Sequence, residues 1–133
     1  MSLSELQELL QAYFSQKDDV TVALLFGSYA KGTAHEGSDV DIAVHCRNPL
    51  SINEFLSMQT ELSALCHREI DLIDLRKAEG TILYQIMTTG IRIKYEENQY
   101  VYYSMKALYF YEDYLPILRR CQQERIRRFV NGY

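Results

Sequence analysis

The chain has 133 residues, of which 47% are hydrophobic and 24% are charged, and this composition is typical of one globular domain. Its formal net charge of −4 argues against general attraction to a nucleic-acid backbone, so direct nucleic-acid binding is not expected. No apolar run approaches the roughly 20 residues of a membrane helix, and the N-terminal segment lacks the basic start of a signal peptide. The three cysteines, Cys46, Cys66 and Cys121, are odd in number, which favours reduced thiols in a cytoplasmic protein.

The first part of the chain predicts one helix followed by two strands. In residues 4–16 the leucines recur on one stripe, which indicates an amphipathic helix with Ser4 as its N-cap. Residues 20–26 are β-branched and apolar throughout, as expected of a buried strand. Residues 38–46 alternate between polar and apolar side chains, and this period of two predicts a second strand.

The middle of the chain continues the alternation of helices and strands. Residues 51–67 predict a helix that begins with a capping box, because Ser51 is followed three residues later by Glu54. After this helix we expect a third strand, a helix that ends at a glycine, and a short fourth strand, at residues 69–75, 78–90 and 91–95.

The last third of the chain, residues 97–133, has a mostly helical pattern. Pro116 lies inside it, and a proline within a helix costs about 3 kcal/mol, so we expect a kink or break near Tyr114 and Leu115. The predicted fold class is therefore α/β (α+β), with a small mixed sheet packed against helices. We expect residues 1–96 to form the domain proper and residues 97–133 to form a helical extension packed on it.

A glycine-containing turn follows the first predicted strand. Gly27 has no Cβ, so the backbone here can approach a ligand closely. Ser28 is expected to cap a helix that begins near Tyr29, and a helix N-terminus attracts phosphate. Turns of this composition are also common without any ligand, so the turn alone does not establish a binding site.

Carboxylates are concentrated on the second and third predicted strands. Asp39 and Asp41 are two residues apart and therefore share one face of their strand. Their mutual repulsion would be relieved by Mg²⁺, and two Mg²⁺ ions could share these oxygens and also bind phosphate. Asp71 and Asp74 lie on opposite faces of the third strand, so one of them can join the pair if the strands are neighbours. Periodicity alone does not choose between them.

The stretch GSYAKGTAHEGSDVDIAV, residues 27–44, resembles the signature of the nucleotidyltransferase superfamily with a polymerase-β-like fold. Its Gly-Ser pair is followed by ten residues and then by Asp-Val-Asp, and Ser38 precedes the first aspartate. The short chain is similar to the minimal nucleotidyltransferase (MNT) branch of this superfamily. The resemblance covers about residues 20–95, so residues 1–96 are interpreted as a minimal nucleotidyltransferase domain.

The resemblance implies that ATP is the substrate and that its β- and γ-phosphates lie near Gly27 and Ser28. Lys31 occupies a position where such proteins often have arginine. It is expected to contact the nucleotide with the same charge but without the planar guanidinium.

The resemblance also implies a metal-dependent transfer reaction. Asp39 and Asp41 would hold two Mg²⁺ ions, and the family's third carboxylate matches Asp71. Asp71 would bind the catalytic ion and orient or deprotonate an incoming hydroxyl group, which attacks the α-phosphate of ATP in line. Most of the catalysis would come from positioning and from charge neutralisation.

The MNT branch includes antitoxins encoded beside HEPN-type ribonuclease toxins. Such antitoxins, of the type VII systems, transfer AMP from ATP to a tyrosine of the toxin and block its ribonuclease site. The leading hypothesis is therefore a protein adenylyltransferase antitoxin with a HEPN-type toxin as its partner. Two alternatives stay open: an antitoxin that masks its toxin by binding alone, and an enzyme that modifies a hydroxyl group of a small molecule.

Overall fold

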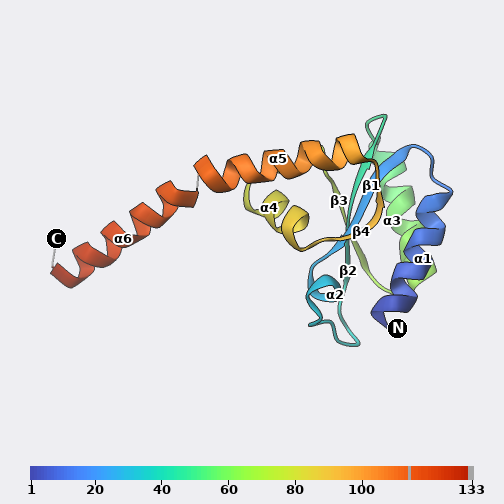
Figure 1. Ribbon diagram of the computed structural model, residues 1–133. Helices are drawn as coiled ribbons and strands as arrows, with labels where there is room; N and C mark the ends of the chain where they lie inside the picture. Colours follow the sequence, from blue (N-terminus) through green and yellow to red (C-terminus); the bar gives the residue numbers. More distant parts are fainter. Residues whose placement is uncertain (114, 132–133) are drawn as a thin grey trace.

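Figure 1 shows the computed structural model of the chain, which describes residues 1–113 and 115–131. The order of elements follows the predicted alternation, including the short helix expected after the first strand, and two helices stand at the end. They are α1 (Leu3–Ser15), β1 (Val20–Phe26), α2 (Ser28–Lys31), β2 (Val40–Cys46), α3 (Ile52–Cys66), β3 (Ile70–Asp74), α4 (Gly80–Thr89), β4 (Ile91–Tyr95), α5 (Glu97–Asp113) and α6 (Leu115–Asn131).

The four strands form one mixed sheet in the order β3-β2-β1-β4. β1 lies in the middle and runs antiparallel to both β2 and β4. β2 and β3 are parallel, and α3 connects them, because parallel neighbours need a crossover. The predicted mixed α/β fold is confirmed, and so is the expectation that the second and third strands are neighbours.

Helices cover both faces of the sheet (Figure 1). On one face, α1 and α3 bury Leu10 and Leu62 in the same apolar cluster as Ile42 of β2. On the other face, α4 and α5 bury Leu83 and Tyr103 in a cluster with Leu24, Ala43 and their neighbours. β2 is therefore an interior strand whose side chains alternate between two cores, as its sequence pattern predicts.

The helix ends agree with the sequence at two places and differ at one. The capping box of α3 is formed as predicted, since the Ser51 side chain accepts from Glu54 N and the Glu54 side chain accepts from Ser51 N. Gly90 is the C-cap of α4, as predicted. The N-cap of α1 is Ser2, not Ser4, and Ser2 forms its own capping box with Glu5. Ser2 has the extended backbone of an N-cap and its side chain accepts from Glu5 N, whereas Ser4 lies within the helix.

The two C-terminal helices relate differently to the sheet. α5 packs against α4 and β1, whereas α6 contacts α5 and extends away from the sheet (Figure 1). The predicted interruption near Tyr114 and Leu115 falls on Tyr114, which lies outside the described residues. The division at residue 96 stays a prediction. Within residues 1–113 and 115–131, no helix has the length and apolar character needed to cross a membrane.

We predict that Ser2→Ala lowers the free energy of unfolding by about 1 kcal/mol, because an N-terminal amide of α1 loses its acceptor. Ser4 is exposed and lies within the helix, so Ser4→Ala should leave stability unchanged or slightly raised, since alanine favours helix. Urea denaturation of the two variants measures the difference. An equal loss in both would contradict the observed cap.

Candidate active site

Gly27 lies at the end of β1 under two separate constraints. Its φ of +73° lies in a region that residues with a Cβ rarely adopt. In addition, Phe26 pairs with Asp41 across the β1–β2 ladder, and a Cβ on Gly27 would overlap with the Asp41 carboxylate. The turn therefore requires glycine in order to hold the chain against this carboxylate.

The short helix α2 follows Gly27 directly. The expectation that Ser28 caps this helix is wrong, because Gly27 is the N-cap and Ser28 is the first helical residue. α2 ends at Gly32, which is left-handed with φ of +74°, and the amide of Thr33 donates to Ser28 O at 3.0 Å. Lys31, in the last turn, is exposed. The connection from β1 to α2 is thus a tight turn that places Gly27 against the Asp41 carboxylate.

Two of the predicted aspartates come together on neighbouring strands. Asp41 of β2 and Asp71 of β3 are partners in the parallel register, and their side chains are hydrogen-bonded to each other. Asp41 is half-buried and Asp71 is exposed. Asp39 immediately precedes β2 and is exposed, and its charge acts on Asp41. The face shared by Asp41 and Asp71 is the face covered by α4 and α5, because Ala43 of the same strand belongs to that core.

Asp74 lies on the other face of β3 and has a different role. It is buried, and its Oδ1 accepts a hydrogen bond of 3.0 Å from the amide of Arg76. This contact closes the turn that follows the strand. Sequence periodicity left Asp71 and Asp74 as alternatives, and the register of β2 with β3 places Asp71 beside Asp41.

The contact between the two carboxyl groups depends on one proton. The pKa of Asp41 is raised to about 6, first by burial and then by the charge of Asp71, the hydrogen bond with Asp71 and the charge of Asp39. Two carboxylates cannot hydrogen-bond to each other when both are ionised, because neither has a hydrogen to donate. Asp41 is therefore the carboxyl group whose ionisation is disfavoured by its surroundings.

The donor set fits a divalent cation such as Mg²⁺. Asp41 and Asp71 present hard oxygen atoms side by side, and a cation would take the place of the proton that they share. In the described part of the chain, no three histidine, cysteine or acidic side chains are arranged as a complete metal site. The structure thus brings two of the three predicted ligands into contact and leaves Asp39 exposed next to them.

The loop before Asp39 is organised by Ser38, which belongs to the predicted signature, and by His35. The Ser38 hydroxyl accepts a hydrogen bond of 2.8 Å from the amide of His35, and His35 Nδ1 accepts one of 3.2 Å from the amide of Gly37. The backbone closes the same turn, with Ser38 N donating to His35 O at 3.0 Å. These contacts fix the entry into β2. The sequence signature included Ser38, but it did not predict its contact with His35.

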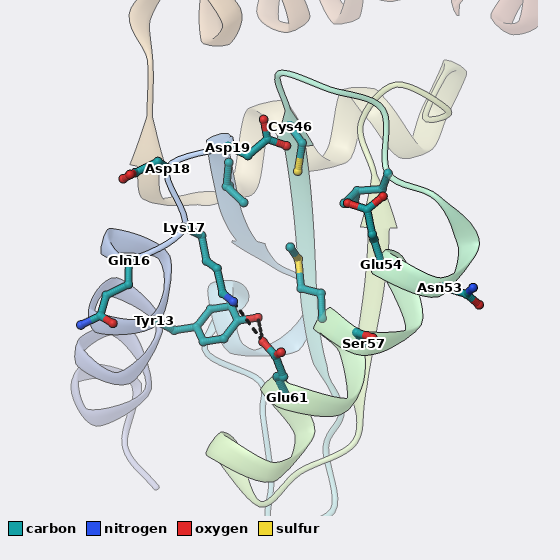
Figure 2. A pocket seen from close by; sticks show the side chains of 13 residues that line it. Tyr13, Gln16, Lys17, Asp18, Asp19, Cys46, Asn53, Glu54, Ser57 and Glu61 are labelled. Carbon is teal, nitrogen blue, oxygen red and sulfur yellow. Dashed lines mark hydrogen bonds and ion pairs between the residues drawn. The ribbon is translucent and has the colours of Figure 1, made fainter.

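A large cavity lies away from the aspartates. Its volume is about 480 Å³, and its lining residues lie between the end of α1 and the start of α3 (Figure 2). Within it the Tyr13 hydroxyl donates to Glu61 at 2.6 Å, and Lys17 forms an ion pair with Glu61 at 3.3 Å. Cys46 also lines it, and burial raises the pKa of this thiol to about 11, so it is not a thiolate at neutral pH. Asp18 and Asp19 line this cavity, but Asp41 and Asp71 do not, so it is separate from the candidate active site.

The raised pKa of Asp41 predicts how stability depends on pH. Between its unfolded value of 3.8 and about 6, the folded protein holds a proton that the unfolded chain has lost. The free energy of unfolding should therefore fall as pH rises through this window. Asp71→Asn removes a neighbouring charge and supplies an amide donor, so it should lower the pKa of Asp41 and flatten this fall.

Urea denaturation from pH 3.5 to 8 in EDTA measures the effect. The matched control is Asp18→Asn, which changes an exposed carboxylate elsewhere and should reproduce the slope of the unmodified protein. If Asp71→Asn kept the full pH dependence of the free energy of unfolding, the raised pKa of Asp41 would not depend on Asp71.

The related proteins found by sequence comparison are named protein adenylyltransferases or putative protein adenylyltransferases. Protein adenylyltransferase MntA of Shewanella oneidensis is 31% identical over 88 residues, which are 66% of this chain and 63% of the relative. MntA of Thermococcus cleftensis is 33% identical over 76 residues, 55% of this chain and 77% of the relative. A putative protein adenylyltransferase of Methanocaldococcus jannaschii is 33% identical over 75 residues, 54% and 76% of the two chains.

Solved structures share the fold. A crystal structure of a toxin–antitoxin with AMP-PNP contains a chain with a TM-score of 0.72 and 24% identity, covering 90% of this chain and 98% of that one. The tri-AMPylated Shewanella oneidensis HEPN toxin in complex with its MNT antitoxin gives a TM-score of 0.68 and 22% identity, covering 91% and 98%. At these identities the likeness establishes the fold.

The family comparison agrees with the arrangement of the site. The profile of the family described as "Polymerase beta, Nucleotidyltransferase" matches residues 8–99, which contain the Gly27 turn and all three aspartates. This match spans more than half of the chain. The chain therefore belongs to the polymerase beta nucleotidyltransferase family, as an MntA-like minimal nucleotidyltransferase.

Proposed function

We propose that this chain is an antitoxin that acts as a protein adenylyltransferase, transferring AMP from ATP to a tyrosine hydroxyl of a HEPN ribonuclease toxin. The observation that carries the proposal is the contact between Asp41 and Asp71 beside the Gly27 turn, in a chain whose relatives are named protein adenylyltransferases. The free thiols of Cys46, Cys66 and Cys121 support a cytoplasmic location.

The nucleotide is expected to bind at the turn between β1 and α2. Gly27 leaves the backbone open to the phosphates, and Ser28 offers its hydroxyl and amide beside them. Lys31, one turn later and exposed, supplies a positive charge for the phosphate chain. A related fold in complex with AMP-PNP supports ATP as the nucleotide.

Asp39, Asp41 and Asp71 would hold the Mg²⁺ ions, with Asp39 and Asp41 contributing to both. When bound, the two ions neutralise the phosphates and stabilise the negative charge that develops during transfer. The acceptor hydroxyl oxygen forms a bond to the α-phosphorus of ATP, the bond from that phosphorus to the oxygen bridging toward the β-phosphate breaks, and pyrophosphate leaves. The exposed Asp71 carboxylate orients the hydroxyl group and accepts its proton.

The partner follows from relatives rather than from the site itself. A chain of the same fold is found in complex with a tri-AMPylated HEPN toxin, which supports an acceptor group on a protein over a small-molecule hydroxyl. Masking of the toxin by binding alone would not need paired carboxylates. Catalysis and masking are separated by the amount of antitoxin required.

We predict that Asp71→Asn lowers the rate of AMP transfer by about 10²–10⁴, the usual effect of losing a positioned acid–base group. ATP binding should change less, because Asp39 and Asp41 are still present. Asp74→Asn is the matched control. It keeps the oxygen that accepts from Arg76 and lies on the opposite face, so it should retain activity. The measurement is a time course of AMP transfer to purified toxin at saturating ATP. An inactive Asp74→Asn with an active Asp71→Asn would show that the active face is misassigned.

Catalysis also predicts turnover and a metal requirement. Antitoxin in large molar deficit should modify all of the toxin when ATP and Mg²⁺ are present, with mass increments equal to AMP. EDTA should abolish these increments, and so should Asp39→Ala or Asp41→Ala in a folded protein. Neutralisation that occurs only at equimolar antitoxin, without any mass change, would favour masking.

A further inference from the structure

A second cavity lies at the opposite end of β2 from the aspartates. It has a volume of about 470 Å³ and is bordered by the end of β2, the turn after β3 and α5. His45, which lines it, is four residues beyond Asp41 on the same strand, a separation of about 13 Å at 3.3 Å per residue. Figure 1 shows α2 and the start of α5 at opposite ends of this strand. The cavity is therefore separate from the candidate active site.

We propose that this cavity is a binding site for a phosphate-bearing anion. Arg47, Arg76 and Lys106 line it, and none of its seven lining residues is acidic. The chain as a whole has a net charge of −4, so the three cationic side chains around this cavity form a locally positive region in an acidic protein. The proposal does not depend on adenylyl transfer.

The cationic side chains of the cavity form few ion pairs with the described side chains. Among the described side chains, Arg76 and Lys106 form no ion pair, and Arg47 has one contact of 3.5 Å with Glu96, in which both partners are largely exposed. Such an exposed ion pair contributes little stabilising free energy. An anion that enters the cavity would thus meet available cations.

Arg76 is held in place by the backbone. Its Nη2 donates to Cys46 O at 2.7 Å and to Arg47 O at 2.8 Å, which fixes the guanidinium at the end of β2. A guanidinium has five N–H donors, so donors remain after these two contacts. The site is therefore partly preorganised, which lowers the entropic cost of binding.

His45 provides a buried polar group at the cavity. Its side chain is 5% exposed, its Nδ1 lies 2.7 Å from Thr21 Oγ1, and its ring packs against Tyr103. Nε2 has no hydrogen-bond partner among the described residues. Burial, followed by the charge of Arg76, lowers the pKa of His45, against the opposing charges of Asp74, Glu96 and Asp19. A bound anion would shift this balance toward the charged imidazole.

One stripe of α5 forms the opposite wall. Gln99, Tyr102, Tyr103 and Lys106 are spaced i, i+3, i+4 and i+7 and all line the cavity, so they share one helix face. The amide, hydroxyl and ammonium groups on this stripe are donors suited to phosphate oxygens. Tyr102 is 58% exposed and offers a ring face beside them. The ligand class is thus a phosphate-bearing molecule, from pyrophosphate to a mononucleotide.

Imidazole NMR of the full chain in EDTA at low salt tests the proposal. The three histidines are His35, His45 and His67, and only His45 lines the cavity. Titration with inorganic pyrophosphate should shift the His45 resonances saturably and raise the pKa of His45, while His35 and His67 stay unchanged. Parallel titrations with inorganic phosphate and AMP identify the preferred ligand. Tighter binding of pyrophosphate would show that phosphate charge determines affinity, and tighter binding of AMP would show that the base contributes most.

A matched pair of variants gives the second readout. Lys106→Gln should weaken pyrophosphate binding by about tenfold or more, the usual effect of losing a charged hydrogen bond. Lys77→Gln makes the same change at an exposed residue beside Arg76 that does not line the cavity, and it should bind as the unmodified protein does. Three results would overturn the proposal: no saturable His45 shift at millimolar pyrophosphate, equal affinities of the two variants, or a shift that requires Mg²⁺.

Discussion

The parallel pairing of β2 with β3 sets the carboxyl groups of Asp41 and Asp71 side by side, and the rest of the site depends on this pairing. The arrangement is unfavourable in the absence of a cation, because two adjacent negative charges repel each other. The sheet can hold it because β2 is an interior strand with an apolar core on each face. Burial of these cores stabilises the register far more than one carboxylate contact opposes it.

Gly27 converts this strand pairing into a candidate binding site. The end of β1 lies against Asp41 through the antiparallel ladder, and only a residue without a Cβ leaves the carboxylate undisturbed. The same absence of a side chain opens the backbone beside the carboxylate to a ligand. A single glycine therefore connects the phosphate-binding turn to the metal-binding strands, which explains why the Gly-Ser pair and the Asp-Val-Asp segment belong to one motif.

The sequence predicted those features that depend on local pattern. The alternation over residues 38–46 was sufficient to place Asp41 on one face, and the spacing of Ser51 and Glu54 was sufficient to place the start of α3. The prediction was wrong where neighbouring residues compete for one role, as with Ser4 and Ser2 at α1 and with Ser28 and Gly27 at α2. In both cases the backbone conformation decides which residue is the N-cap, and residue preference alone does not predict that conformation.

Features built from distant parts of the chain could not be derived from the local sequence pattern. The choice of Asp71 over Asp74 needed the register between β2 and β3 or the family resemblance. The cationic cavity joins Arg47, Arg76 and Lys106 from three elements, and each of them alone resembles an ordinary surface charge. Even the stripe of α5 that faces this cavity has the spacing of a core stripe, so its polar character had no evident meaning until the fold placed it over the end of β2.

The two ends of β2 therefore have opposite electrostatic requirements. Near Asp41 the carboxylates exclude a phosphate until cations are present, whereas near His45 the cations attract a phosphate without any metal. Because about 13 Å of strand separates these ends, their direct charge interaction is largely screened at physiological ionic strength. A phosphate-bearing molecule can thus occupy one end independently of the other, and only the aspartate end depends on bound metal to attract it.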